Sequence, residues 1–301
     1  YEYGNPSKMT QIGFGISGPL AAPWFSSRKA RRVIDAALDA GIRTFDCGSF
    51  YGDGLGESRL GDALKGAADD VVVFSKTGSP REEEKNWRKD FSEEKVRADV
   101  EGSLRRLKRD FLDILYLHGP NKHEFEVGCA SLEALKSEGL IKAGGICCDA
   151  DVARKVYSPA FDAIMAPINF LDQRASATLR QAKDDNLHTT AIAPLAQGVY
   201  EVGYGRVLSL SSFWRNARAR AKTPDLFNQR LEIADRIRGA TERRPLSKAA
   251  LGFVLAEPTI DLAVFTSTNA KRVAALASTE PLPPGEAEAL RAVGDDMKIF
   301  A

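Results

Sequence analysis

Four ionisable residues follow three consecutive segments of the sequence that read as β-strands. Asp46 ends the segment IRTFD, and Tyr51 lies five residues further on. Lys76 ends VVVFSK, and His118 directly follows LDILYL. If these segments are neighbouring parallel strands, their carboxyl ends meet at one rim, where the four side chains converge.

An Asp, a Tyr, a Lys and a His at one rim suit acid–base chemistry on a carbonyl oxygen. A tyrosine holds its proton at neutral pH because its ordinary pKa is about 10, and it can donate that proton as negative charge develops. We expect Lys76 to lower the pKa of Tyr51, and Asp46 to keep the lysine charged and oriented. We expect His118 to donate a second hydrogen bond to the same oxygen. Each residue alone also fits a structural role, so the prediction rests on their joint placement.

The elements that must position these residues alternate along the chain. Strands are predicted for 12–16, 42–46, 71–76, 112–117, 142–146, 162–168, 188–194 and 262–267. Amphipathic helices are predicted for 26–41, 57–64, 92–109, 126–138, 150–157, 175–185, 226–240, 270–278 and 285–293. Eight strand–helix units in 301 residues predict an α/β fold, a single-domain (β/α)8 TIM barrel. An open doubly wound sheet is the alternative.

The N-terminal region contains a segment that we do not expect to belong to the barrel, and a glycine motif that only superficially matches a dinucleotide-binding pattern. We expect residues 1–8, ahead of Met9, to be vector-derived or disordered, and 9–301 to form the barrel. The glycines of 13–18 match the G-x-G-x-x-G pattern of dinucleotide-binding folds. Pro19 and Pro23 separate that pattern from the next helix, so we expect it to be the first barrel strand and its loop.

Composition narrows the range of partners. Lys plus Arg number 42 and Asp plus Glu number 41, so the net charge of +1 gives no broad surface for nucleic acid or an anionic membrane. No apolar run approaches the roughly 20 residues that span a bilayer, and no signal peptide is recognisable. The four cysteines form no CxxC pair, which favours a reducing, cytoplasmic setting. No residue cluster has the spacing of a metal site. We expect a small-molecule substrate. The sequence leaves open whether the chain forms a homo-oligomer.

The ordered motifs resemble one known family. Asp46-x₄-Tyr51-Gly is followed by Gly-Glu-Ser58, by Lys76, by Ser-Leu-Arg-Arg-Leu over 103–107 and by Leu-His118. This combination is similar to that of the aldo-keto reductases. The resemblance implies a (β/α)8 barrel with Asp46, Tyr51, Lys76 and His118 as catalytic residues and Tyr51 as the general acid/base. It also implies hydride transfer between a nicotinamide cofactor, usually NADP, and a carbonyl compound or its alcohol.

The resemblance also indicates a cofactor site, with changes. It implies that Ser267 and Arg272 bind the adenosine 2′-phosphate and that Cys147 and Asn169 lie near the nicotinamide. The polar or aromatic residues that the family usually places against the nicotinamide are changed to Cys147, Met165 and Ile192. Since each lost hydrogen bond removes roughly 0.5–1.5 kcal/mol, we expect nicotinamide affinity to be lower by about two to three orders of magnitude.

Three hypotheses follow for the function. The first is an NADP-dependent oxidoreductase that interconverts a small carbonyl compound and its alcohol. The second is a non-redox acid/base enzyme, a dehydratase or isomerase acting on a sugar-like substrate with weak or no nicotinamide binding. The third is a non-catalytic partner subunit, which the complete Asp, Tyr, Lys and His set argues against. The basic insertion 198–227 suits either a strap over a ligand or a solvated surface.

Overall fold

The computed structural model describes residues 11–64, 70–80, 88–198, 213, 217, 220–221, 228–242 and 244–297. The predicted N-terminal segment 1–8 and most of the insertion 198–227 lie outside these residues. Contacts along the chain divide it into two units. The first comprises Tyr1–Ala166, Ala175–Ile192 and Thr259–Ser278, and the second Pro167–Arg174, Ala193–Pro258 and Thr279–Ala301.

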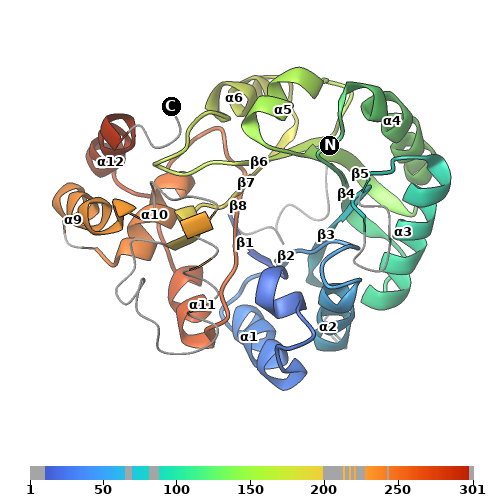
Figure 1. Ribbon diagram of the computed structural model, residues 1–301, viewed down its shortest axis with the longest axis horizontal. Helices are drawn as coiled ribbons and strands as arrows, with labels where there is room; N and C mark the ends of the chain where they lie inside the picture. Colours follow the sequence, from blue (N-terminus) through green and yellow to red (C-terminus); the bar gives the residue numbers. More distant parts are fainter. Residues whose placement is uncertain are drawn as a thin grey trace. The chain divides into compact units, whose positions relative to one another are not determined.

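Eight parallel strands close into a barrel in sequence order, from β1 beside β2 round to β8 beside β1 (Figure 1). The strands are β1 Ile12–Gly15, β2 Thr44–Asp46, β3 Val72–Thr77, β4 Leu112–His118, β5 Ile141–Cys147, β6 Ala163–Pro167, β7 His188–Ile192 and β8 Leu262–Phe265. The predicted (β/α)8 TIM barrel is therefore confirmed, and the open-sheet alternative is wrong. The glycine-rich motif at 13–18 contributes β1, as expected.

The barrel interior is largely apolar. Its core cluster consists of Val72, Phe74, Ile114, Tyr116, Ala143, Cys147, Ala163, Met165, Leu262 and Val264, with Ile192 packed against it. Strands covered on both faces read as nearly continuous apolar runs, which explains why the β3 and β4 segments are so hydrophobic. The register pairs Lys76 with Tyr116 and His118 with Cys147, so the functional candidates come at the carboxyl ends of their strands.

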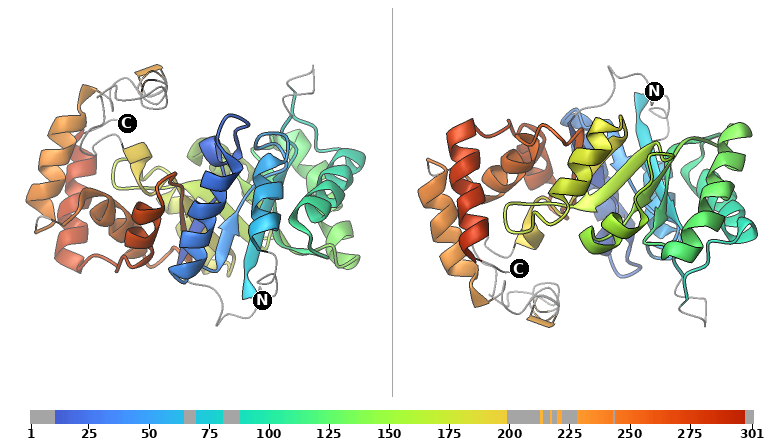
Figure 2. Two further views of the ribbon diagram at one scale, coloured as in Figure 1. Left: turned by 90° about the horizontal axis from the view of Figure 1, so that it is seen from below. Right: turned by 90° about the horizontal axis from the view of Figure 1, so that it is seen from above.

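Helices of the first unit cover the outside of the barrel (Figures 1 and 2). They are the 3-10 helix η2 Gly18–Ala21 and the α-helices α1 Ser27–Asp39, α2 Leu55–Ala63, α3 Glu93–Leu107, α4 Lys122–Ser137, α5 Ala150–Val156, α6 Ser176–Asp184 and α11 Ala270–Ala277. In α1, Ala30, Val33, Ile34 and Ala37 are buried at helical spacing, as the sequence pattern predicts. Gly41 ends this helix with a φ of +85°, a conformation that costs glycine little.

Among the described residues of the second unit, three helices pack together, α9 Arg230–Ala240, α10 Leu246–Leu255 and α12 Pro284–Met297, and the short 3-10 helix η4 is formed by Ala196–Gly198. α12 packs closely against the backbone of Phe170 in the same unit. A Cβ at Gly294 would lie 1.7 Å from the Phe170 carbonyl oxygen, so only glycine fits there. The helix α10 was not predicted from the sequence. Eight of its ten residues are buried, so it lacks the one-sided apolar pattern that identifies a surface helix.

Candidate active site

Asp46 and Lys76 form a buried ion pair inside the mouth of the barrel. The Lys76 ammonium donates hydrogen bonds to Asp46 Oδ1 and, at 2.9 Å, to the Cys47 carbonyl oxygen. Lys76 is 2% exposed and Asp46 is 5% exposed. Burial lowers the pKa of Lys76, but Asp46 more than offsets this and holds that pKa above its ordinary value. The lysine therefore remains a cation at neutral pH.

Tyr51 lies next to this ion pair. The Lys76 Nζ atom is 5.3 Å from the centroid of the Tyr51 ring. The tyrosine is half-buried, and its hydroxyl has no hydrogen-bond partner among the described residues. Burial raises the pKa of Tyr51 to about 12 against the opposing effect of Lys76. Lys76 lowers this pKa, as expected, but the loss of solvent around the phenol outweighs the nearby charge, so the pKa lies above its ordinary value.

The β2–α2 loop that carries Tyr51 depends on close backbone approaches. Gly52 has a φ of +58°, and a Cβ there would lie 1.9 Å from the Ala21 carbonyl oxygen. A Cβ at Gly48 would lie 3.1–3.2 Å from the rings of Phe50 and Tyr51. The glycines therefore allow the loop to lie against η2 and allow both aromatic rings to lie over the loop backbone.

His118 joins the site through Phe50. The Phe50 ring stacks on the imidazole with centroids 4.6 Å apart and planes 21° apart, and it contacts the Tyr51 ring at 4.3 Å. The Ser79 hydroxyl lies 2.5 Å from His118 Nδ1. Burial, Lys76 and Lys89 lower the pKa of His118 to about 3, so the imidazole is neutral at physiological pH. The structure thus brings the four sequence-predicted residues together at one rim.

The lowered pKa values of the two buried histidines, His118 and His188, predict how the stability of the protein depends on pH. Burial also lowers the pKa of His188, with Asp261 opposing and Lys183 assisting, to about 4. In the unfolded chain both imidazoles titrate near pH 6.5, so the unfolded state binds more protons below that pH. We expect the free energy of unfolding to fall as the pH drops from about 6.5 to 5, by at most about 1.4 kcal/mol per pH unit for each histidine.

Denaturant unfolding at several pH values, repeated on His118→Gln and His188→Gln, measures this slope. Each variant should flatten it. A stability that is constant over this pH range, with slopes unchanged in both variants, would show that the histidines are not neutral in the folded protein.

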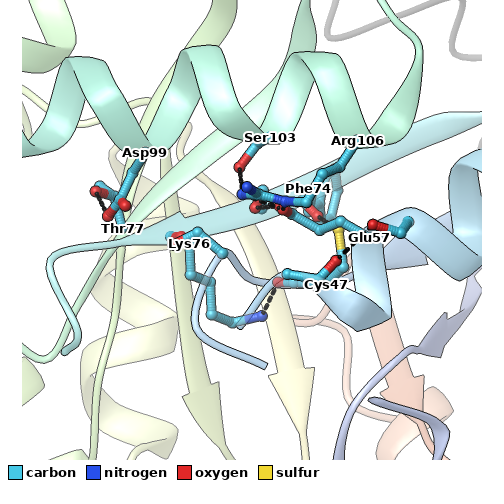
Figure 3. A network of polar contacts seen from close by, with 12 residues as sticks. Cys47, Glu57, Phe74, Lys76, Thr77, Asp99, Ser103 and Arg106 are labelled. Atoms are coloured by element: carbon cyan, nitrogen blue, oxygen red, sulfur yellow. Dashed lines mark hydrogen bonds and ion pairs between the residues drawn. The ribbon is translucent and has the colours of Figure 1, made fainter. Parts of the chain in front are cut away.

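A buried clamp on the outer face of β3 was missed from the sequence (Figure 3). Glu57 of α2 is fully buried and accepts a hydrogen bond from Ser75 at 2.6 Å. It also accepts from Arg106 of α3, whose Nε and Nη2 atoms lie 2.8 and 2.7 Å from Glu57 Oε2. Glu57 and Arg106 lie within the motifs that carry the family resemblance, which is the signal that could have identified them.

The clamp positions Lys76 through the alternation of the strand. Successive side chains of a strand point to opposite faces, so Ser75 and Thr77 face the helices while Lys76 faces the interior. Thr77 donates a hydrogen bond of 2.8 Å to Asp99 of α3. In Figure 3, Asp99, Ser103 and Arg106 project from α3 toward this strand, while the Lys76 side chain extends to the opposite side. Both neighbours of Lys76 are thereby fixed.

The four residues predicted to contact the cofactor differ in burial and in their hydrogen-bond partners. Cys147 ends β5 within the apolar core, where burial raises the pKa of its thiol to about 12. Ser267 is half-buried and accepts the Asn269 N–H at 3.2 Å. Arg272 is exposed in the first turn of α11, which Asn269 caps by accepting the Arg272 backbone N–H. Asn169 belongs to the second unit.

Asn169 is occupied with its own loop. Its Nδ2 donates to the Ala193 carbonyl oxygen at 3.2 Å, and its Oδ1 accepts the backbone N–H groups of Leu171 and Asp172 at 3.0 Å. Within the described part of the chain, no group of three or more His, Cys, Asp or Glu residues could hold a metal ion. None of the described helices combines the length and the apolar character needed to cross a membrane.

Comparison with known proteins agrees with this geometry. The model of the Aldo/keto reductase family matches residues 11–295. The chain is 32% identical over 263 residues to D-threo-aldose 1-dehydrogenase from Pseudomonas sp, covering 76% of each protein. Aldo-keto reductase AKR11C1 from Bacillus halodurans, in its holo form, has the same fold at 24% identity, with a TM-score of 0.77 over 95% of this chain and 92% of that one.

A second solved structure has the same fold with a ligand. It is an aldo-keto reductase from Klebsiella pneumoniae in complex with NADPH, 21% identical, with a TM-score of 0.70 over 95% of this chain and 91% of that one. The family match covers the barrel and the four rim residues together. The chain therefore belongs to the aldo/keto reductase family and is an NAD(P)-dependent oxidoreductase.

Proposed function

We propose that this protein interconverts a small carbonyl compound and its alcohol with NADP as the cofactor, and that Tyr51 is the general acid and base. One observation carries the proposal. A buried, charged Lys76 paired with Asp46 lies against the ring of a tyrosine whose hydroxyl is available to a substrate. The neutral imidazole of His118 stacks on the Phe50 ring, which also contacts the Tyr51 ring.

The four side chains divide the proton chemistry. The bound cofactor supplies or accepts the hydride. During reduction, the Tyr51 hydroxyl donates its proton to the carbonyl oxygen as charge develops there. The Lys76 ammonium stabilises the tyrosinate that forms, and Asp46 keeps Lys76 charged and in place. His118, neutral, donates a second hydrogen bond to the oxygen from its imidazole N–H. Alcohol oxidation runs the same proton path in reverse.

The residues at the end of β8 fit a phosphate group. The first turn of an α-helix presents backbone N–H groups and the positive end of the helix dipole. Arg272 lies in that turn of α11 and is exposed, with Ser267 just before it. A guanidinium binds a phosphate in a bidentate manner, so these residues would hold the 2′-phosphate that distinguishes NADP from NAD.

The nicotinamide end is predicted to bind more weakly. Cys147, Met165 and Ile192 offer apolar surface for a ring but only a thiol as a polar partner. Cys147 is the proposed contact to the nicotinamide, and Asn169 of the second unit is a separate proposed cofactor contact. Relatives support a small carbonyl or sugar-like substrate. One is named D-threo-aldose 1-dehydrogenase and another, from Escherichia coli, NADH-specific methylglyoxal reductase.

The cysteines support a reducing compartment. All four are free, and Cys47, Cys147 and Cys148 are buried. We propose a cytoplasmic location on this basis, because proteins of oxidising compartments are the ones that form and keep disulfides.

Cofactor binding is the direct test. Titrating the protein with NADPH and NADH, followed by fluorescence, should show tighter binding of NADPH. Arg272→Gln should weaken NADPH binding by about tenfold or more and leave NADH unchanged, because a hydrogen bond to a charged group contributes about 1.5–3 kcal/mol. Arg105→Gln, which removes an exposed arginine from α3, is the matched control and should change neither affinity.

Two results would contradict the proposal. No binding of either nucleotide at millimolar concentration, with acid/base turnover of a sugar-like substrate, would favour the non-redox dehydratase or isomerase. Binding without turnover on any small aldehyde, ketone or sugar would favour a non-catalytic subunit.

A further inference from the structure

Ser79 lies directly beside the histidine of the proposed site. It follows β3 and is 5% exposed, and its hydroxyl oxygen is 2.5 Å from Nδ1 of His118. The parallel pairing of β3 with β4 matches Thr77 with Leu117, which brings the residues just beyond the two strands together. The contact is therefore a product of the barrel register and joins residues 39 positions apart.

The surroundings indicate the direction of this hydrogen bond. Among the described residues, Nδ1 of His118 is the only hydrogen-bond partner of the Ser79 hydroxyl. A neutral imidazole carries one N–H and has one nitrogen that accepts. If the serine donates to Nδ1, the hydroxyl hydrogen is satisfied and the imidazole hydrogen lies on Nε2. In the opposite arrangement, the hydroxyl hydrogen of a nearly buried serine has no acceptor among these residues.

The ring is held in this orientation by its other neighbours. Phe50 stacks on one face of the imidazole. The backbone just after His118 is fixed by Lys89, whose ammonium donates a hydrogen bond of 2.6 Å to the Gly119 carbonyl oxygen. With the plane and the backbone fixed, Nε2 is the nitrogen left for a ligand.

The position of the imidazole hydrogen matters for the reaction. A carbonyl oxygen has only lone pairs, so it can accept a hydrogen bond from an N–H but not from a bare nitrogen. The neutral ring cannot supply a second hydrogen. Its tautomer therefore decides whether His118 can assist Tyr51.

We infer that Ser79 is a positioning residue that holds His118 in its Nε2–H tautomer and aims that N–H at the substrate oxygen. The identity of that oxygen rests on the proposed function, whereas the tautomer does not. A serine suits this role better than a carboxylate. A carboxylate accepts from Nδ1–H, which leaves Nε2 without a hydrogen unless the ring becomes a cation, and Lys76 and Lys89 both oppose that cation.

The tautomer can be read without substrate or cofactor. In protein labelled with ¹⁵N-histidine, two-bond ¹H–¹⁵N correlation spectra distinguish the protonated nitrogen from the bare one. The chain has three histidines, so His118→Gln assigns the His118 signals. We expect the Nε2–H form in the parent protein and in Ser79→Thr, and a mixture of both tautomers in Ser79→Ala. The Nδ1–H form in the parent, or an unchanged spectrum in Ser79→Ala, would overturn the inference.

Kinetics test the consequence for the reaction. Ser79→Ala should lower kcat by about tenfold, since an oxyanion donor is misdirected rather than removed. Its KM for NADPH should stay unchanged, and Ser79→Thr should restore kcat. Ser131→Ala is the matched control, because Ser131 is also buried but donates to the Val127 carbonyl oxygen within α4. A shifted tautomer with an unchanged kcat would overturn the positioning role. A parent protein without turnover would contradict the proposed function. The NMR spectra would still test the tautomer, because they need neither substrate nor cofactor.

Discussion

Replacing Tyr51 with Phe is expected to lower kcat for carbonyl reduction by about 10²–10⁴-fold, the range that a positioned general acid contributes. The change removes one hydroxyl oxygen and keeps the ring that contacts Phe50 and lies near Lys76. NADPH binding should therefore be retained. The measurement is steady-state oxidation of NADPH with a panel of small aldehydes, ketones and sugars, together with the fluorescence titration of the cofactor.

Tyr157→Phe is the matched control for this variant. The Tyr157 hydroxyl donates a hydrogen bond of 2.6 Å to Asp185, next to α6 and outside the candidate site. Its removal should leave kcat unchanged. An active Tyr51→Phe enzyme would remove Tyr51 from the acid/base role, and equal losses in both variants would indicate a general effect on folding.

Replacing Glu57 with Gln should reduce the free energy of unfolding by about 3 kcal/mol, near the lower end of the range for breaking a buried ion pair. The carboxylate is fully buried and receives hydrogen bonds from Ser75 and Arg106. Its loss leaves the Arg106 cation, whose side chain is 20% exposed, without its counter-ion. Denaturant unfolding followed by circular dichroism gives the free energy.

Glu138→Gln provides the comparison for Glu57→Gln. Glu138 also pairs with an arginine, Arg97, but the two side chains are 42% and 33% exposed. Solvent screens exposed ion pairs, so this variant should be nearly as stable as the parent. Similar losses in the two variants would show that burial of the Glu57 clamp adds nothing to stability.

Much of the fold follows from sequence because central strands and surface helices carry different patterns of apolar residues. The strands that carry Lys76 and His118 are buried on both faces, and their apolar runs identify them and their carboxyl ends. Their meeting at one rim then follows from the rule that parallel strands close a barrel. The uniformly apolar α10 was missed for the converse reason, since a buried helix lacks an exposed polar face.

The missed parts of the site depend on distances between remote residues. The clamp joins Glu57 to Arg106, 49 positions away, and Ser79 reaches His118 across two strands. No local pattern encodes either contact. The net shift of the Tyr51 pKa did not follow from the sequence, because the sequence reveals a neighbouring cation but not the loss of water around the phenol.

The contact between α12 and Phe170 has a consequence for the order of folding. The second unit is assembled from three stretches of chain separated by parts of the barrel, and Gly294 of α12 lies directly against the Phe170 backbone. Contacts between residues so distant in sequence form slowly, because the entropy of closing the intervening loop is lost first. During synthesis, Phe170 leaves the ribosome long before its partner helix exists. Among the described elements of the second unit, α12 is made after the others and therefore completes this core.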